Sequence, residues 1–302
     1  MWFKNLAVYR LQKPFEHTPE LLHELLAECE FKPCAGQELS RMGWVPPLGR
    51  QGQQLVHAAG GYIMLCARRQ ERVLPAASVN EALEDQVDAL QKAEDRRVGR
   101  KEKSDIKKEL VFSMVPKAFT RSKNVFGYIA VEAGLVIIDA ASSTVAEEWL
   151  DALREALGSL QIIPLKATRD PIQVMTGWLQ GVAPDNGLGL GNECELKDAQ
   201  DVQSVIRGRN QDLHSDEFKA HLENGMIVTK VGLQWQDRLQ CVVDEKFTLK
   251  KLSFDDIVQE RAESAEVEDA AQQFDLDFSI MSLELDAFLK GLIEAFGGIS
   301  EE

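Results

Sequence analysis

A basic strip runs through the middle of an otherwise acidic chain. Over 302 residues, 49 Asp and Glu outnumber 34 Lys and Arg, which gives a net charge of −15. Between Gln91 and Lys123, however, 11 Lys and Arg accompany only five Asp and Glu, a local charge of +6. Such a strip can neutralise phosphates, because backbone contacts to a nucleic acid need charge and reach rather than fixed spacing.

The strip supports two interpretations. In the first, its side chains contact DNA phosphates without reading sequence. In the second, it is a solvated surface helix, in which Lys103 and Lys107 are set among Glu102 and Glu109. The candidate DNA-binding residues of the strip are Arg97, Arg100, Lys101, Lys103, Lys107, Lys117, Arg121 and Lys123.

An aromatic residue, Phe119, lies inside the strip in the stretch PKAFTRSKN, between Lys117 and Arg121. Its ring would either anchor the segment to a core or stand exposed. An exposed ring would stack on a base or fill a pocket of a partner as an interface contact. The residue types alone leave all three roles open.

A second, thinner basic set follows in the other half of the chain. Its candidate DNA-binding residues are Arg207, Arg209, Lys230 and Lys250. From Asp255 to Asp286, by contrast, 11 acidic residues accompany one basic residue, Arg261. A negative net charge opposes nucleic-acid binding when it is spread evenly, but this charge is segregated. One basic surface on an acidic protein is therefore compatible with DNA binding.

Residues arranged for catalysis are not apparent in the sequence. The glycine-rich stretch 186–192 lacks the Lys of a phosphate-binding loop, so we expect a flexible loop there. The five histidines form no zinc-hydrolase pair, and there is no nucleophile elbow. Acidic pairs such as Asp255-Asp256 and Asp275 with Asp277 could serve a metal-dependent nuclease, but a solvated acidic face explains them as well. We expect no enzyme, no cofactor and no metal.

Several features favour a cytoplasmic protein. No window approaches the roughly 20 apolar residues of a membrane span. The first residues, MWFKNLAVYRLQ, alternate like a strand and lack a cleavage site, so no signal peptide is expected. Five cysteines at scattered spacings are typical of reduced thiols.

The periodic patterns predict an α+β fold of mixed, mostly antiparallel sheets with packed helices. Helices are expected after Thr18-Pro19, at 78–98 with a Ser78/Glu81 capping box, from Ser104 to Pro116, before Gly158, after Asp170-Pro171, from Ser215 to Asn224, and at the C-terminus. Strands are expected at 2–11, 62–68, 193–198 and 202–208. A hairpin is expected at 125–139, and an antiparallel meander from Met226 to Phe254. Residues 42–49, MGWVPPLG, indicate a turn-rich loop carrying Trp44.

This pattern predicts three parts. Residues 1–77 together with 125–167 would form an N-terminal α+β domain. Residues 78–124 would form a helical basic excursion, serving as a tip or gate. Residues 168–302 would form a C-terminal α+β domain with the acidic segment and a closing helix.

Seven long stretches resemble the RdgC family, the recombination-associated proteins of proteobacteria. They are WFKNLAVYRL, MGWVPPLG, CARRQERVLP, LVFSMVPKAFTRS, IRGRNQDL, VTKVGLQWQDR and LIEAFGG, and the resemblance runs nearly end to end.

The resemblance implies a nucleoid-associated, non-catalytic homodimer that closes into a ring around double-stranded DNA. Binding would be largely independent of sequence, with single-stranded DNA as a further ligand. The implied role is to restrain the RecA recombinase, directly or by competition for DNA. In this view Phe119 is a gate contact between the two subunits. The alternative is an interaction protein that binds RecA directly and touches DNA only weakly.

Overall fold

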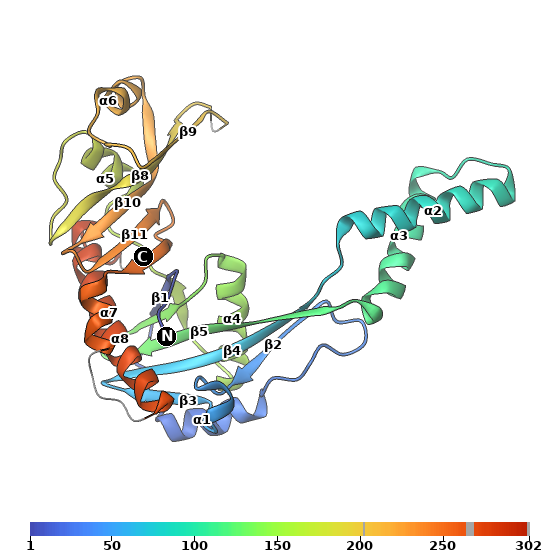
Figure 1. The fold of residues 1–302 in the computed structure, drawn as a ribbon, viewed down its shortest axis with the longest axis horizontal. Helices are drawn as coiled ribbons and strands as arrows, with labels where there is room; N and C mark the ends of the chain where they lie inside the picture. Colours follow the sequence, from blue (N-terminus) through green and yellow to red (C-terminus); the bar gives the residue numbers. More distant parts are fainter. Residues whose placement is uncertain (202, 264–268, 301–302) are drawn as a thin grey trace.

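The chain forms a crescent with a long arm at one end (Figure 1). The computed structural model describes residues 1–201, 203–263 and 269–300. Two sheets, of seven and five strands, make the body, and within the described residues the paired strands of both sheets run antiparallel. The expected α+β class with mostly antiparallel strands is therefore confirmed.

The larger sheet has the strand order β2-β4-β5-β6-β1-β7, with β3 pairing the edge of β4. Helices α1 and α4 cover one face, where Leu22, Trp44 and Trp149 share a buried core. The elements of this half are β1 (Ala7–Leu11), α1 (Pro19–Glu28), β2 (Ser40–Val45), η1 (Gly49–Gln51), β3 (Val56–Ala59), β4 (Tyr62–Arg72), β5 (Thr120–Ala130), β6 (Leu135–Ile138), α4 (Ser143–Leu157) and β7 (Ile162–Pro164).

Strands β4 and β5 extend past the rest of the larger sheet as a ribbon that carries the arm (Figure 1), and β2 pairs with β4 along this ribbon as far as Glu71. The sequence explains this, because β5 begins with polar, exposed residues and ends with the buried run from Val125 to Ala130. The strand starts at Thr120, five residues before the expected hairpin. Arg121 and Lys123 therefore lie on the ribbon and not on a helix.

The arm consists of α2 (Ala76–Glu94) and α3 (Arg100–Met114), followed by the short turn η2 (Val115–Lys117). Val79, Leu83 and Val87 are the buried residues of α2. The predicted Ser78/Glu81 capping box is wrong, since α2 already begins at Ala76 behind Pro75. The limits predicted for these two helices also differ from the observed ones. Asp95 adopts a left-handed φ of 46° that ends α2, and α3 starts at Arg100 rather than Ser104.

The smaller sheet has the order β12-β11-β10-β8-β9. Its elements and helices are α5 (Pro171–Leu179), β8 (Leu188–Asp198), β9 (Val205–Arg209), α6 (Asp216–Glu223), β10 (Met226–Trp235), β11 (Leu239–Asp244), β12 (Leu249–Phe254), α7 (Asp256–Glu263) and α8 (Ala270–Ala295). Two expected loops are strands. Residues 188–192 belong to β8, and Trp44 is buried in β2. Of the predicted strand 202–208, position 202 lies outside the described residues.

Helix α8 joins the two sheets through one continuous core. Its Phe278 contacts Tyr128 of β5, and its Phe288 contacts Trp235 of β10. The sheets also touch directly, because Leu6 and Leu249 exchange two backbone hydrogen bonds of 2.8 and 3.0 Å. The acidic segment 255–286 forms α7 and the first part of α8, while its residues 264–268 lie outside the described residues.

Candidate nucleic-acid interface

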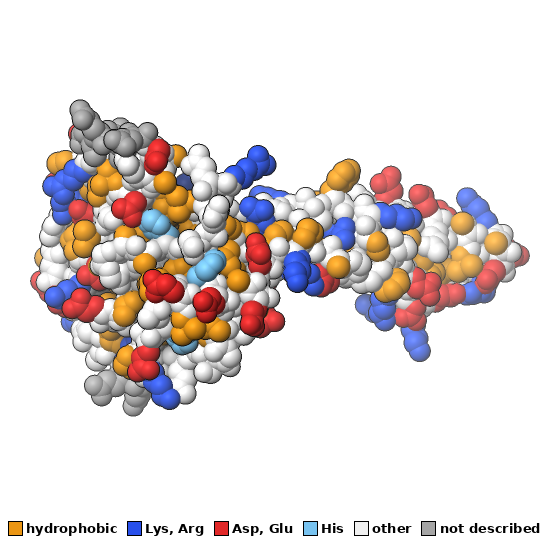
Figure 2. Space-filling model, turned by 90° about the horizontal axis from the view of Figure 1, so that it is seen from below, with side chains coloured by type: hydrophobic (Ala, Val, Ile, Leu, Met, Phe, Trp, Pro, Cys, Tyr) orange, Lys and Arg blue, Asp and Glu red, His pale blue; other side chains and the backbone are white. Residues whose placement is uncertain are grey.

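The predicted DNA-binding cations of the arm and ribbon are exposed. Figure 2 shows Lys and Arg side chains at intervals along the arm, with Asp and Glu among them toward its far end. Arg96 pairs with Glu94 and Glu102, and Lys108 pairs with Asp105 at 3.1 Å. Within the described residues, no ion pair involves the predicted cations Arg97, Arg100, Lys101, Lys103, Lys107, Lys117, Arg121 and Lys123.

Lys107 is the one of these residues for which a side-chain hydrogen bond is found, from its Nζ to Asn80 Oδ1 of α2 at 3.0 Å. The pairing expected for a solvated helix is thus sparse on α3, since Glu102 is engaged by Arg96 instead. The arm carries cations that remain available to an anion.

The elbow, where the arm meets the ribbon, exposes apolar side chains. Phe119 is 88% exposed, so the interpretation as a core anchor is wrong. Leu39 and Phe112 are 58% and 64% exposed and line a hollow of about 460 Å³ with Val111 and Val115. Val73 joins the same region by donating its backbone N–H to the carbonyl of Phe119 at 2.7 Å. Exposed apolar clusters of this kind are typical of interaction sites.

Arg72, at the end of β4, holds the segment that presents Phe119. Its Nη1 donates to the carbonyls of Pro116 and Ala118 at 3.3 and 3.1 Å. Its Nη2 donates to the carbonyl of Cys34 at 3.3 Å. One guanidinium therefore joins the segment directly before Phe119 to the loop that contains Cys34.

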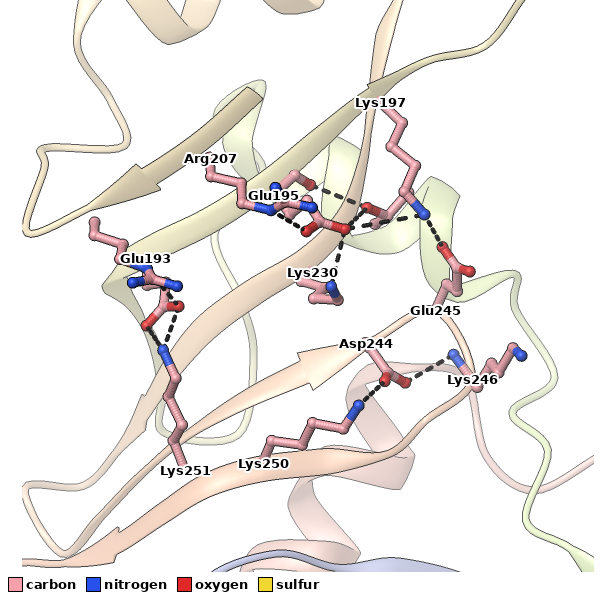
Figure 3. Close-up of polar contacts among 12 residues, drawn as sticks. Glu193, Glu195, Lys197, Arg207, Lys230, Asp244, Glu245, Lys246, Lys250 and Lys251 are labelled. Atoms are coloured by element: carbon pink, nitrogen blue, oxygen red, sulfur yellow. Dashed lines mark hydrogen bonds and ion pairs between the residues drawn. The ribbon is translucent and has the colours of Figure 1, made fainter. Parts of the chain in front are cut away.

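The second basic set lies on one face of the smaller sheet (Figure 3). Strand β8 pairs antiparallel with β9, which places Glu193 opposite Arg209 and Glu195 opposite Arg207. On the other side of β8, Lys230 of β10 pairs with Glu195 and also with Asp244 of β11. Directly opposed residues of an antiparallel pair share a face. The charged residues are therefore gathered by strand register.

Glu195 is the centre of this face. Its side chain is 7% exposed and accepts hydrogen bonds from Arg207 Nε at 2.8 Å and Lys230 Nζ at 2.9 Å. Lys197 Nζ lies 3.9 Å away. Burial alone would raise the pKa of the carboxyl, but the hydrogen bonds and charges of Lys230 and Arg207 outweigh it and lower the pKa to about 2. Glu195 is ionised at neutral pH.

Three further carboxylates, Glu193, Asp244 and Glu245, engage cations of the face, and Glu245 lies 3.8 Å from Lys197 Nζ (Figure 3). Glu193 accepts from Lys251 Nζ at 2.6 Å and lies 3.8 Å from Arg209 Nε. Asp244 lies 3.4 Å from Lys250 Nζ. All four predicted residues here, Arg207, Arg209, Lys230 and Lys250, are thus paired with carboxylates.

Gly208 lets this charged edge pack closely. It separates Arg207 from Arg209, and a Cβ there would lie 2.5 Å from Cζ of Phe218 in α6. The opposite face of the sheet is covered by helices, as the contact of Thr176 in α5 with the N–H of Val228 shows. The charged face is open to solvent at Arg207 and Arg209, whose side chains are 62% and 71% exposed.

The described part of the chain contains no group of three or more His, Cys, Asp or Glu arranged to hold a metal. The five cysteines are free, as expected. Burial raises the pKa of Cys66 and of Cys241 to about 12, so these thiols stay protonated at neutral pH. No described helix has the length and apolarity required to cross a bilayer.

The comparison with known proteins agrees with the motifs. A family model described as "Putative exonuclease, RdgC" matches residues 1–299. The chain belongs to the RdgC family. The Recombination-associated protein RdgC of Salmonella paratyphi B is 40% identical over 299 residues, covering 99% of this chain and 98% of that protein. Those of Pseudomonas putida GB-1 and Psychromonas ingrahamii are each 38% identical, covering 99% of this chain and 98% and 99% of theirs.

Sequence reasoning missed several residues of this RdgC chain that organise its basic surfaces. Glu193 and Glu195 pair with the predicted cations, Arg72 supports Phe119, and Leu39 with Phe112 lines the elbow. The alternation Glu193-Cys194-Glu195 against Arg207-Gly208-Arg209 was a usable signal, because two strands of opposite charge favour pairing. Nothing local to Arg72 or Leu39 indicated their roles.

Proposed function

We propose that this chain is a sequence-independent DNA-binding protein that closes as a homodimeric ring around duplex DNA and restrains RecA-mediated recombination. Its membership of a family named for recombination supports a role at DNA. The observation that carries the proposal is the row of exposed arm cations without carboxylate partners among the described residues. Such cations are free to displace the counterions of a phosphate backbone.

Ring closure is supported by the shape and by the elbow. A crescent cannot encircle DNA alone, but two crescents related by a two-fold axis can. The exposed ring of Phe119 lies close in sequence to a hollow lined by Val111, Phe112 and Val115. In a two-fold contact, Phe119 of each copy would enter the hollow of the other. This would make the elbow a gate through which DNA enters.

Binding without catalysis is part of the proposal. The family model's description names an exonuclease, whereas the relatives are named recombination-associated proteins. Incubation of end-labelled linear duplex with the protein and Mg²⁺ tests this point. We expect the label to stay in full-length DNA, and progressive loss of terminal nucleotides would contradict the proposal.

The main experiment measures binding to a linear duplex and to a covalently closed circle of the same sequence across a salt series. For about six to ten phosphate contacts, affinity should fall about a thousandfold or more from low to moderate salt. Complexes on the circle should survive a salt challenge, while those on the linear DNA slide off its ends. A shallow salt dependence without a topological difference would overturn the proposal and favour direct binding to RecA. The same titration with single-stranded DNA tests whether the protein also binds that form of DNA.

A further inference from the structure

A buried carboxylate amid cations can act on DNA binding in two opposite ways. It can compete with phosphate for the basic side chains, or it can hold those side chains in the orientation that phosphate requires. The charged face of the smaller sheet contains two carboxylates on one strand, Glu193 and Glu195, and their surroundings differ.

We infer that Glu195 is a positioning residue, which orients the guanidinium of Arg207 toward DNA phosphates and holds the ammonium of Lys230 beside it. The inference rests on the proposed DNA-binding function and assigns a role within it. The neighbouring Glu193 has the opposite role and competes with phosphate for Lys251.

The geometry at Arg207 supports orientation. The side chain of Arg207 is 62% exposed although Glu195 is almost fully buried, so the pair spans from the sheet to solvent. Arg207 gives its Nε to Glu195 at 2.8 Å. A guanidinium has five N–H donors. Its two terminal nitrogens, for which the described residues supply no acceptor, can therefore form the paired bonds that phosphate oxygens accept.

The charge around Glu195 also favours phosphate over self-neutralisation. Three cations, Lys197, Arg207 and Lys230, lie within 3.9 Å of one carboxylate. With Glu195 ionised, these three cations keep a charge of +2, which Glu245, 3.8 Å from Lys197 Nζ, reduces to +1. Without the carboxylate, three like charges would repel one another and separate, because long exposed side chains are free to do so.

Glu193 differs in burial and in the partner that it holds. Its side chain is more exposed than that of Glu195, and its shortest contacts are with the single ammonium of Lys251. A lysine ammonium is a point charge on a flexible stem and has no planar orientation to preserve. Removing the negative charge of Glu193 therefore frees the ammonium of Lys251 to bind phosphate and disturbs no fixed side-chain orientation.

The two glutamates thus give a test with opposite signs. Glu195→Gln and Glu193→Gln make the same charge change on the same strand. We expect Glu195→Gln to weaken duplex binding about eightfold at 0.1 M salt and to lower the salt slope by about 0.9, the loss of one phosphate contact. Glu193→Gln should tighten binding. Equal tightening of duplex binding by both variants would overturn the inference, because the loss of one negative charge would then explain both results.

A mutant cycle distinguishes positioning from general disturbance of the sheet. If Glu195 acts through Arg207 and Lys230, then Glu195→Gln should no longer weaken binding in an Arg207→Ala/Lys230→Ala background. The same loss in both backgrounds would contradict the inference. Glu195→Asp, which retains the carboxylate, should recover part of the affinity that Glu195→Gln loses.

Arg207→Lys keeps the test decisive if Glu195→Gln does not fold. Arg207 is exposed, so this substitution leaves the core intact, and it retains the charge while removing the planar fork. We expect weaker duplex binding, and unchanged affinity would overturn the inference. Absence of duplex binding by the wild-type chain would instead contradict the proposed function itself.

Discussion

The arm and the smaller sheet both carry predicted DNA-binding cations, but they hold them differently. The arm presents its cations from helix α3 and from the turns beside it, and Arg97, Arg100 and Lys101 make no ion pair among the described residues. On the sheet, Arg207, Arg209 and Lys230 each lie against a carboxylate set by strand register. For the same number of basic residues, the sheet therefore presents less net positive charge to DNA than the arm does.

The difference follows from the elements that carry the residues. A solvated helix spaces side chains along a cylinder, and only i, i+3 and i, i+4 neighbours meet. A sheet places side chains of adjacent strands about 5 Å apart, so a row of like charges would repel unless carboxylates are interleaved. The sheet can therefore hold cations in defined positions, whereas the arm holds more net charge.

The largest effect is expected from removing three free cations of the arm. In Arg97→Ala/Arg100→Ala/Lys101→Ala, loss of three phosphate contacts would lower the salt slope by about 2.7 and the duplex affinity about 500-fold at 0.1 M salt. Fluorescence anisotropy over a salt series, on two unrelated duplex sequences, measures both. The loss should be alike for the two sequences, because backbone contacts carry no sequence information. An unchanged slope would mean that the arm does not contact phosphate.

The pH dependence of stability should distinguish the sheet from the arm. The pKa of Glu195 in the folded chain is about 2 against an ordinary 4.5, so its contribution is complete above pH 4.5 and is lost as pH falls toward 2. A shift of this size corresponds to about 3 kcal/mol, at 1.36 kcal/mol for each pKa unit. Urea denaturation should show the free energy of unfolding falling more steeply for the wild type than for Glu195→Gln over that range.

The matched control on the arm is Glu102. Hydrogen bonds from Arg96 lower the pKa of its carboxyl as well, but the pair is exposed to solvent, which screens it. Glu102→Gln should therefore leave the acid dependence of stability close to that of the wild type. An equal change in both variants would contradict the distinction between a buried and an exposed ion pair.

The local elements were largely predictable, whereas the contacts between them were not. The cap of α1 by Thr18 and of α5 by Asp170 follow from residues adjacent in sequence, and both are confirmed by side-chain hydrogen bonds of 3.3 and 2.9 Å. Gly158 ends α4 in a left-handed conformation, as expected. These features depend on a few neighbouring residues, which the sequence displays directly.

The failures share a physical cause. Trp44 was assigned to a loop because two prolines follow it closely, yet strand β4 pairs with its backbone and its ring is buried against Trp149 of α4. The partners of Arg207 and Lys230 were missed because the register between β8, β9 and β10 joins residues 12 to 35 positions apart. Register is decided by the packing of whole strands, which no local window contains.

A triple substitution on the sheet provides the direct counterpart to the arm variant. Glu193→Gln/Arg209→Gln/Lys251→Gln removes as many charged groups but changes the net charge by only one. The salt slope should fall by no more than about 0.9 and the affinity at 0.1 M salt by no more than about eightfold. The same anisotropy titration measures it. A loss as large as that of the arm variant would show that paired and free cations contribute equally, and the comparison would fail.

The smallest thermodynamic effect is expected at the elbow. Phe119 is 88% exposed, so Phe119→Ala should change the free energy of unfolding by less than about 0.5 kcal/mol. If its ring closes the gate, however, the variant should leave a closed DNA circle during a salt challenge nearly as fast as it leaves linear DNA. Leu283→Ala, which removes another exposed apolar side chain on α8, is the control and should stay on the circle. Normal retention by Phe119→Ala would remove Phe119 from the gate. A change in stability would mean that its ring packs within its own chain, which its exposure argues against.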